Sequence, residues 1–446
     1  MMPSTPASAV TQPALVAQHV EEAALLRMMR GVLVRAPHVD LQALARSDNR
    51  LAAHLDGCAV AGDAGLRLAM AALEASAGLG ECFVVAVRVA ELGDVGLLAS
   101  LRARCAKLPE AHRAVASALG WVSASALKGV VASLLAGQDA ESRALGVTAC
   151  AMHRVAPGAA LSRALQDGDI GLRATGWQVA AKLGALEMAE AARDALRSLG
   201  ATPTPSDAAS RAAAWALTLW GEGGAGLARQ ALIQPQEARA LPPESTHRLA
   251  VLSAPLDWGR VEVRRLGAMP ASDPDAQRRM VRVAAWLGDP QIVPWLIHRM
   301  ADPAWGRLVG EAFSLITGAD LDGLGLFQAQ PEAFESGPSE APDDELVGLD
   351  EDEGLLWPDQ AKVQAWWQAN AHRFLPGQRY FVGEPPSPAH CLHVLKTRGQ
   401  RARIIAAEHL CLLRPGTKLF PVAAPAWRQS RWLAEEEAAL ASSPSP

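Results

Sequence analysis

The chain has 446 residues, of which 50% are apolar, and a formal net charge of −5. One tyrosine and seven phenylalanines accompany abundant alanine and leucine, a composition that favours helices over sheets. No uncharged run approaches the roughly 18 apolar residues of a membrane span, and the N-terminal residues lack the charged and apolar segments of a signal peptide. We therefore expect an all-α protein that is neither inserted in a membrane nor exported by the general route.

The six cysteines are scattered, and none stands in a C-x-x-C pair. They are Cys58, Cys82, Cys105, Cys150, Cys391 and Cys411. Several follow alanine or valine, where a small thiol packs well in a core. This usage predicts reduced, buried cysteines in a cytoplasmic protein.

The first predicted elements are helices over residues 14–30 and 41–56, with a turn at Ala36 and Pro37. A unit then recurs, in which an apolar helix ends in Leu-Gly or its equivalent and a shorter helix follows. The first helices of these units are predicted over residues 83–92, 111–119, 170–183, 208–220 and 276–287. The glycines that follow them are Gly93, Gly120, Gly184, Gly221 and Gly288, spaced by 27, 64, 37 and 67 residues. This spacing, one or two units of about 30 to 37 residues, predicts an α-solenoid of stacked helical hairpins.

Residues 276–303 give the clearest example of the unit. Gly288 suits the position after the last turn of the first helix, and Pro290 suits the first turn of the second. Val293, Leu296 and other apolar residues then give the second helix a buried stripe. Neither helix can bury its stripe alone, so the unit predicts neighbours of the same kind.

Charge predicts the domain boundaries. Residues 1–307 carry 31 Lys+Arg against 28 Asp+Glu, residues 308–361 carry none against 14, and residues 362–446 carry 11 against 5. Because the acidic stretch is also rich in glycine and proline, we expect a solvated flexible linker there. The predicted division is a disordered tail over 1–13, a repeat domain over 14–320, the linker over 321–357, a small helical domain over 358–432 and a second disordered tail over 433–446.

The segment LRATGWQVAAKLG at residues 172–184 resembles the first helix of a HEAT-like repeat, of the type found in tetrapyrrole (PBS) lyases. Gly288-Asp289-Pro290 resembles the turn of the same repeat type. The resemblance covers residues 60–320 and implies a scaffold, because HEAT-like repeats serve many unrelated functions.

The order of the motifs along the chain also resembles a known group. A WLGDP turn is followed by GEAFSLITG at residues 310–318, the acidic stretch, WPD…WW at 357–367 and PAWRQ at 425–429. This order resembles an uncharacterised bacterial family of HEAT-repeat proteins that is often encoded beside type VI secretion genes. The resemblance implies a secretion-associated context and supplies no catalytic residues.

Three patterns could carry chemistry, and each also has an ordinary structural explanation. Gly221, Gly223 and Gly226 satisfy G-x-G-x-x-G, but they follow a predicted helix rather than the β-strand of a dinucleotide site. The acidic run over residues 343–353 lacks the alternating pattern of a calcium loop. The metal-like set is His390, His393, His409 and Cys411. His409 and Cys411 would point to different sides of a helix, so we predict no metal, cofactor or catalytic residue.

A basic cluster follows in the C-terminal region. Its members are Lys396, Arg398, Arg401 and Arg403. It could bind phosphates, face water on an amphipathic helix, or dock on the acidic stretch of the same chain. The overall acidity argues against nucleic acid as a partner.

The second helices of HEAT-like units usually line a concave face, and their solvent-side residues are the predicted contacts with a protein partner. By helical periodicity these residues are Arg102, Lys107, Glu190, Arg193, Arg197, Trp295, His298 and Arg299. Trp295 beside Arg299 would suit a binding hot spot, although Trp295 could equally pack between repeats.

These patterns predict a non-enzymatic scaffold for protein–protein interaction, such as an adaptor or chaperone for a secreted effector. Two other classes stay open. One is an immunity-type inhibitor of a toxin, whose acidic stretch would mimic a nucleic acid. The other is an enzyme on a HEAT-like scaffold, acting on tetrapyrrole-linked proteins or on DNA bases, although no basic flank for DNA is evident.

Overall fold

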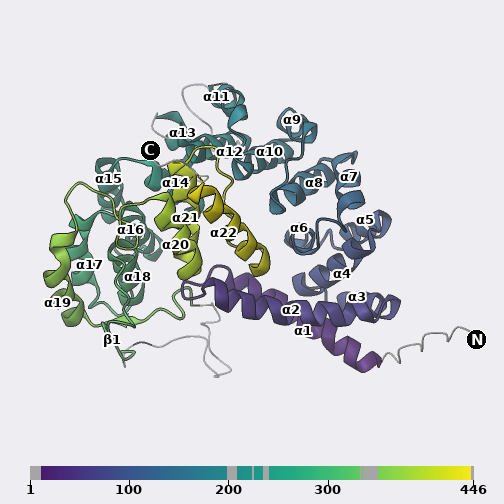
Figure 1. Cartoon of the computed structure of the whole chain (residues 1–446), viewed down its shortest axis with the longest axis horizontal. Coiled ribbons are helices and arrows are strands. Elements are labelled where there is room, and N and C mark those ends of the chain that lie inside the picture. The colour runs from purple at the N-terminus through teal and green to yellow at the C-terminus, as the bar shows by residue number, and fades with distance from the viewer. Residues whose placement is uncertain are drawn as a thin grey trace, which may run out of the picture. The chain divides into compact units, whose positions relative to one another are not determined.

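The computed structural model describes residues 12–197, 208–222, 226–234, 241–331, 334 and 350–442. The fold of these residues is all-α, as the composition predicted, with helices α1 to α22 (Figure 1). One short antiparallel pair joins β1 (Phe327–Gln328) to β2 (Trp357–Pro358). None of the described helices combines the length and hydropathy that a membrane crossing requires.

The chain divides into two compact units, which we call unit 1 and unit 2. Unit 1 comprises Met1–Val34, Gln42–Ala164 and Ala423–Gln429. Unit 2 comprises Arg35–Leu41, Leu165–Val422 and Ser430–Pro446. Each unit therefore combines segments that lie far apart in the sequence. The domain boundaries expected from the charge distribution stay predictions.

Unit 1 is built around α4. Its helices are α1 (Pro13–Leu33), α2 (Leu41–Val60), α3 (Asp63–Ala75), α4 (Leu79–Leu92), α5 (Val95–Arg104), α6 (Ala111–Trp121), α7 (Lys128–Leu135), α8 (Ala140–Met152) and α9 (Ala159–Leu165). Helix α4 packs against α1, α3 and α6. Its residues from Cys82 to Ala90 are all buried, as expected of a helix that is apolar on nearly every side.

Unit 2 holds the remaining helices. They are α10 (Ile170–Leu183), η1 (Leu186–Met188), α11 (Ala189–Arg197), α12 (Ala208–Leu217), η2 (Thr218–Glu222), α13 (Leu227–Ile233), α14 (Glu244–Ser253), α15 (Leu256–Gly267), α16 (Pro274–Leu287), η3 (Pro290–Ile292), α17 (Val293–Arg299), α18 (Gly306–Thr317), α19 (Gln360–Asn370), η4 (Ala371–Arg373), α20 (Pro388–Thr397), α21 (Gln400–Leu413) and most of α22 (Ala426–Ala441). Packing is local: α10 packs on α12, α14 on α16 and α16 on α18.

Glycines end several of the helices, as the Leu-Gly pattern predicted. Gly93, Gly184 and Gly288 are C-caps with φ of 69°, 68° and 66°, a left-handed conformation that glycine adopts without a Cβ penalty. Gly120 differs, because it lies inside α6. A Cβ there would lie 2.7 Å from the sulfur of Met152, so this glycine allows close packing rather than ending the helix.

In unit 2, a segment before α20 covers the C-terminal ends of three helices. The N–H of Tyr380 donates to the carbonyl of Gly288 after α16 at 2.8 Å, and the N–H of Val382 donates to that of Leu315 in α18 at 2.6 Å. The Arg379 guanidinium donates to carbonyls at the end of α14. These bonds satisfy carbonyl groups that have no partner within their own helix.

In unit 1, the segment Ala423–Gln429 has the same role. Arg428 donates to the carbonyls of Val122 at 2.6 Å and Trp121 at 2.9 Å, at the end of α6. Arg30 forms a buried ion pair with Asp48, with 2.6 Å between Nε and Oδ1, and also donates to two carbonyls of this segment. The C-terminal part of the chain thus supplies helix caps within both units.

Candidate functional site

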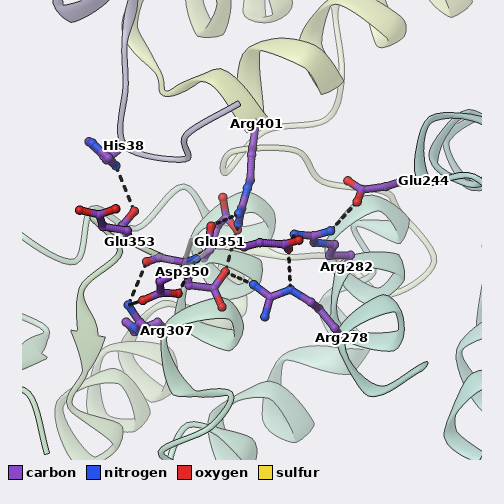
Figure 2. A network of polar contacts seen from close by, with 11 residues as sticks. His38, Glu244, Arg278, Arg282, Arg307, Asp350, Glu351, Glu353 and Arg401 are labelled. Carbon is purple, nitrogen blue, oxygen red and sulfur yellow. Dashed lines mark hydrogen bonds and ion pairs between the residues drawn. The ribbon is translucent and has the colours of Figure 1, made fainter. Parts of the chain in front are cut away.

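Four arginines from three helices of unit 2 surround one short acidic segment (Figure 2). We call these arginines the arginine cluster: Arg278 and Arg282 on α16, Arg307 on α18 and Arg401 on α21. We call residues 350–353, with the sequence Asp-Glu-Asp-Glu, the acidic strip.

Local sequence signals position the two arginines of α16. Asp273 caps the helix by accepting the N–H of Ala276 at 3.0 Å, and Pro274 occupies its first turn. Arg278 and Arg282 are four residues apart and therefore lie one turn apart on the same face. The opposite face of α16 is apolar and buried, which fixes the direction of both arginines.

Glu351 lies between these two arginines. Its Oε2 accepts from Nε of Arg278 at 2.9 Å and from Nη2 of Arg282 at 2.8 Å. Its backbone carbonyl accepts from Arg401. The side chain of Glu351 is 61% exposed, whereas those of Arg278 and Arg282 are only 21% and 15% exposed. One side of the contact thus faces solvent.

The two aspartates of the strip, Asp350 and Asp352, are less exposed than Glu351. Asp352 has a side chain only 5% exposed and pairs with Arg278, while its Oδ1 lies 3.5 Å from Nη1 of Arg401. Asp350 pairs with Arg307 at 2.7 Å. The Arg307 guanidinium also donates to the carbonyl of Asp352 at 3.2 Å. Backbone and side chains of the strip are therefore both recognised.

Aromatic rings hold Arg307 in place. Its guanidinium carbon lies 5.0 Å from the ring centre of Trp357 and 4.7 Å from that of Phe334, within the range of a cation–π contact. Trp357 is buried in β2, directly after the strip. At the other side, the carbonyl of Glu353 lies 3.1 Å from Nδ1 of His38. The strip is thus held at both ends.

Two further carboxylates lie behind the arginines. Oε2 of Glu311 lies 2.6 Å from Nη1 of Arg401, and Glu244 pairs with Arg282. Glu244, Arg282, Glu311 and Arg401 line a cavity of about 40 Å³, whose wall also contains Trp286 and several aliphatic side chains. A volume of this size can hold a water molecule. Glu244 and Glu311 thus orient Arg282 and Arg401, and the remaining N–H groups of these two arginines contact the strip.

The charges shift the pKa values of the strip. Burial raises the pKa of Glu351, but the charges of Arg282 and Arg278 outweigh burial and the net pKa is lowered. At Asp350, burial also raises the pKa, but the hydrogen bonds from Arg307 and the Asp352 N–H, together with the charges of Arg307 and Arg278, outweigh it and the net pKa is lowered. Both carboxylates are therefore fully ionised at neutral pH. At Glu311 burial dominates, and the pKa is raised despite the neighbouring Arg401.

This arrangement is suited to binding carboxylates. Guanidinium groups stay protonated at physiological pH and present several donors in a rigid fork. Charge-assisted bonds of this kind are shorter and stronger than neutral ones. The site therefore holds the acidic strip of the same chain through charge-assisted bonds.

The acidic strip differs from the sequence prediction. Residues 343–353 were expected in a solvated linker, and residues 343–349 lie outside the described part of the chain. Residues 350–352, in contrast, form ion pairs with four arginines, and Asp352 is buried. Charge composition alone predicts solvation only when no opposite charge lies within reach, and here three helices bring such charges together.

The basic cluster of the C-terminal region also differs in part. Arg401 docks on the acidic strip, which was one of the three alternatives. Arg403 is fully buried and donates to the carbonyl of Leu395 at 2.8 Å, so a water-facing position is wrong for this residue. Lys396 pairs with Glu437 at the surface.

Three of the predicted partner contacts meet on α11. Glu190 pairs with both Arg193 and Arg197, at 2.8 Å for Arg197. Arg193 also pairs with Glu222 at 2.6 Å. These side chains are exposed or half-exposed, and their role as contacts stays a prediction.

Three others lie on α17. Trp295 and Arg299 are half-buried, and His298 is exposed. Helix α19 packs on α17, and Gln360 donates to the carbonyl of Ile297 at 3.0 Å. Part of α17 is therefore covered by the chain itself.

The remaining two predicted contacts lie in unit 1. Arg102 donates to the hydroxyl of Ser142 at 2.6 Å and lies 3.5 Å from Glu141. This contact ties α5 to α8. Lys107 is exposed just after α5. The binding role of both residues stays a prediction.

The metal-like set does not come together. His390 bonds to the carbonyl of Phe381 at 2.8 Å, and Cys411 to that of Thr417 at 3.5 Å. Among the described residues, no three His, Cys, Asp or Glu side chains are arranged to hold a metal ion. Of the glycine motif, Gly221 lies within η2, Gly226 is the N-cap of α13, and Gly223 lies outside the described residues.

Sequence patterns alone did not single out Arg278, Arg282 or Arg307. One signal could have found the first two: a pair of arginines four residues apart on the polar face of an amphipathic helix. Read together with an acidic stretch that has no basic residues of its own, this pair indicates a partner for that stretch.

Comparison with known proteins found no relative: no family model, no curated protein and no solved structure matches this chain.

Proposed function

We propose that this chain is a non-enzymatic protein-interaction scaffold, and that its arginine cluster binds an acidic segment of a partner protein. One observation carries the proposal: the cluster already holds an acidic polypeptide segment, the strip of the same chain. A site that contacts three consecutive acidic residues, Asp350, Glu351 and Asp352, through side chains and backbone is suited to a polypeptide rather than to a small ion.

The partner segment would replace the acidic strip. Because Glu351 is largely exposed, a competing carboxylate can approach Arg278 and Arg282 from solvent. The strip competes at a high effective concentration, since it belongs to the same chain. A partner must therefore contribute further contacts elsewhere. The helix pairs, arranged as an α-solenoid of HEAT-like units, would supply that surface.

The biological setting rests on the sequence resemblance. A protein of the secretion-associated HEAT-repeat group would act in the cytoplasm as an adaptor or chaperone for a secreted effector. The immunity-type alternative needs an acidic stretch that faces a toxin. The described part of that stretch is turned toward the chain's own arginines, which favours the adaptor.

A peptide-binding measurement tests the proposal. The probe is a fluorescein-labelled peptide with the sequence of residues 348–355, measured by anisotropy. A strip variant, Asp350→Asn with Glu351→Gln and Asp352→Asn, should bind it about tenfold more tightly than the unchanged chain, because the internal competitor is weakened.

Two further variants make the test specific. Arg278→Glu, added to the strip variant, should abolish binding, whereas Arg264→Glu should not. Arg264 is a matched control, since it is an exposed arginine of α15 in the same unit. Absence of peptide binding by a strip variant with an unchanged circular dichroism spectrum would refute the proposal.

A further inference from the structure

A second site lies in unit 2, apart from the arginine cluster. A cavity of about 300 Å³ is formed between the C-terminal ends of α14 and α21 and the loop before α20. Its apolar wall includes Leu252, Leu412 and Leu413. Leu413 is 41% exposed and marks the side open to solvent. This volume is at the lower end of the range for small-molecule pockets, which begins at about 300 Å³.

One polar side chain in the cavity wall has no partner. His409 is only 4% exposed, and no hydrogen bond from the described residues reaches either of its ring nitrogens. Within the described part of the chain, its ring contacts that of Phe381 in a tilted arrangement, with centroids 5.2 Å apart. Burial, with a smaller effect of the Arg379 and His390 charges, lowers the pKa of His409 to about 3. The imidazole is therefore neutral and offers one N–H donor. Its ring nitrogens are not among the fully enclosed, unpaired side-chain atoms of the described residues, so a molecule in the cavity can reach them.

The second polar group of the cavity is a half-buried cation, Arg379. Arg379 donates to three carbonyls at the end of α14, with Nη2 2.7 Å from the oxygen of Ala254. It forms no ion pair with a carboxylate of the described residues; the nearest negative influence is Asp289. Burial lowers the pKa of Arg379 only to about 10, so the guanidinium stays charged at neutral pH. Two of its five N–H groups remain available after these three bonds.

We infer that this cavity binds a small organic carboxylate. The carboxylate would accept from the free N–H groups of Arg379 and from the N–H of His409, and its apolar body would lie against Leu252, Leu412 and Leu413. Such a ligand gives Arg379 a carboxylate partner and accepts from the imidazole at once. A cation is excluded by the charge of Arg379. A purely apolar ligand would leave Arg379 without a carboxylate and the N–H of His409 without an acceptor.

The probe for the test is hexanoate, with hexan-1-ol as the neutral analogue of the same chain length. Isothermal titration of the full chain should give saturable binding of hexanoate at one site. Hexan-1-ol should bind about tenfold more weakly, since it lacks the charge-assisted bonds. Equal affinity for the two probes would overturn the inference, and so would the absence of saturable hexanoate binding.

Substitutions locate the site. His409→Phe keeps the ring and removes the donor, and it should weaken hexanoate binding about tenfold. His298→Phe changes an exposed histidine of α17 outside the cavity and should leave binding unchanged. Leu412→Trp fills the cavity without touching either polar group and should abolish binding, which keeps the test valid if the His409 variant does not fold. Binding that survives Leu412→Trp in a folded chain would contradict the assignment.

Discussion

Unit 2 contains two groups of paired arginines and carboxylates that differ in almost every physical respect. On α11, Glu190 pairs with Arg193 and Arg197 within seven residues, and these three side chains are 37% to 67% exposed. In the arginine cluster, Arg278 and Arg282 reach Glu351 across 73 and 69 residues, from side chains that are 21% and 15% exposed. The pairs on α11 lie mainly on the surface of a single helix, whereas the pairs of the arginine cluster connect segments that are distant in the sequence.

The two groups should differ in how much they contribute to the stability of the fold. Exposed pairs within a helix are screened by salt and lose side-chain entropy, so they add little to stability. Partly buried pairs between distant segments are screened less. Removal of one partner leaves the other charge buried, without a counter-charge and poorly hydrated, which is destabilising. The arginine cluster should therefore hold the acidic strip in place, whereas the α11 group should leave the fold unaffected.

The largest expected effect follows removal of Arg401. Arg401→Met leaves the largely buried Glu311 without its partner, and Asp352 with only one arginine. We expect a loss of about 3 kcal/mol in the free energy of unfolding, because an uncompensated buried charge is costly. The shift of the urea midpoint measures it. A loss no larger than that of an exposed pair would remove the contrast between the two groups.

A double variant separates charge from packing. Adding Glu311→Gln to Arg401→Met removes the uncompensated carboxylate, so part of the lost stability should return. If the double variant is no more stable than Arg401→Met alone, the loss comes from packing of the long side chain rather than from its charge.

A smaller effect is expected at the acidic strip. Glu351→Gln removes two charge-assisted bonds, to Arg278 and Arg282. Because Glu351 is 61% exposed, solvent screens part of this gain, and we expect a loss of about 1 kcal/mol. Urea unfolding measures the change, and the equivalent substitution Glu190→Gln on α11 serves as the matched control. Equal losses at the two positions would show that sequence distance and burial do not matter here.

Much of the fold could be predicted because its signals are local. The Leu-Gly endings at Gly93, Gly184 and Gly288 identify helix ends through a single conformational requirement, a positive φ. Apolar periodicity identified the helices between them. Gly120 is an exception to this rule. It also follows a leucine, but it lies inside α6, where the missing Cβ leaves room for Met152 of another helix. No local sequence pattern reveals such a contact.

The candidate site could not be predicted because it is built from long-range pairs. Composition reveals an acidic stretch and a basic cluster that could meet, but three of the four arginines, Arg278, Arg282 and Arg307, lie outside that basic cluster. Which face of α16 meets residues 350–353 depends on how α16, α18 and α21 pack. The unpartnered His409 is likewise invisible in a sequence, because burial and the absence of a bond appear only in three dimensions.

The pH dependence of the strip sharpens the comparison. Glu351 has an ordinary pKa of 4.5 when unfolded and a lower one when folded, so its contribution to stability is present above pH 4.5. As the pH falls through the lowered pKa, the unfolded state binds more protons and the contribution is lost. The difference between the unchanged chain and Glu351→Gln should therefore shrink below pH 4.5. Urea midpoints over a pH series measure it, and a difference independent of pH would contradict the assigned ion pairs.

The smallest expected effect is at Arg193, which pairs with Glu190 and Glu222 on the surface. Arg193→Ala should leave the urea midpoint unchanged within error, because water and salt replace both pairs. The measurement is made at low and at high salt, alongside Glu351→Gln. Added salt should remove any small effect of Arg193→Ala while leaving most of the effect of Glu351→Gln, since Arg278 and Arg282 are largely shielded from solvent. A midpoint shift at Arg193 as large as that at Glu351 would mean that the exposed group also shapes the fold, and that proximity in sequence is no guide to the contribution of a charge in this chain.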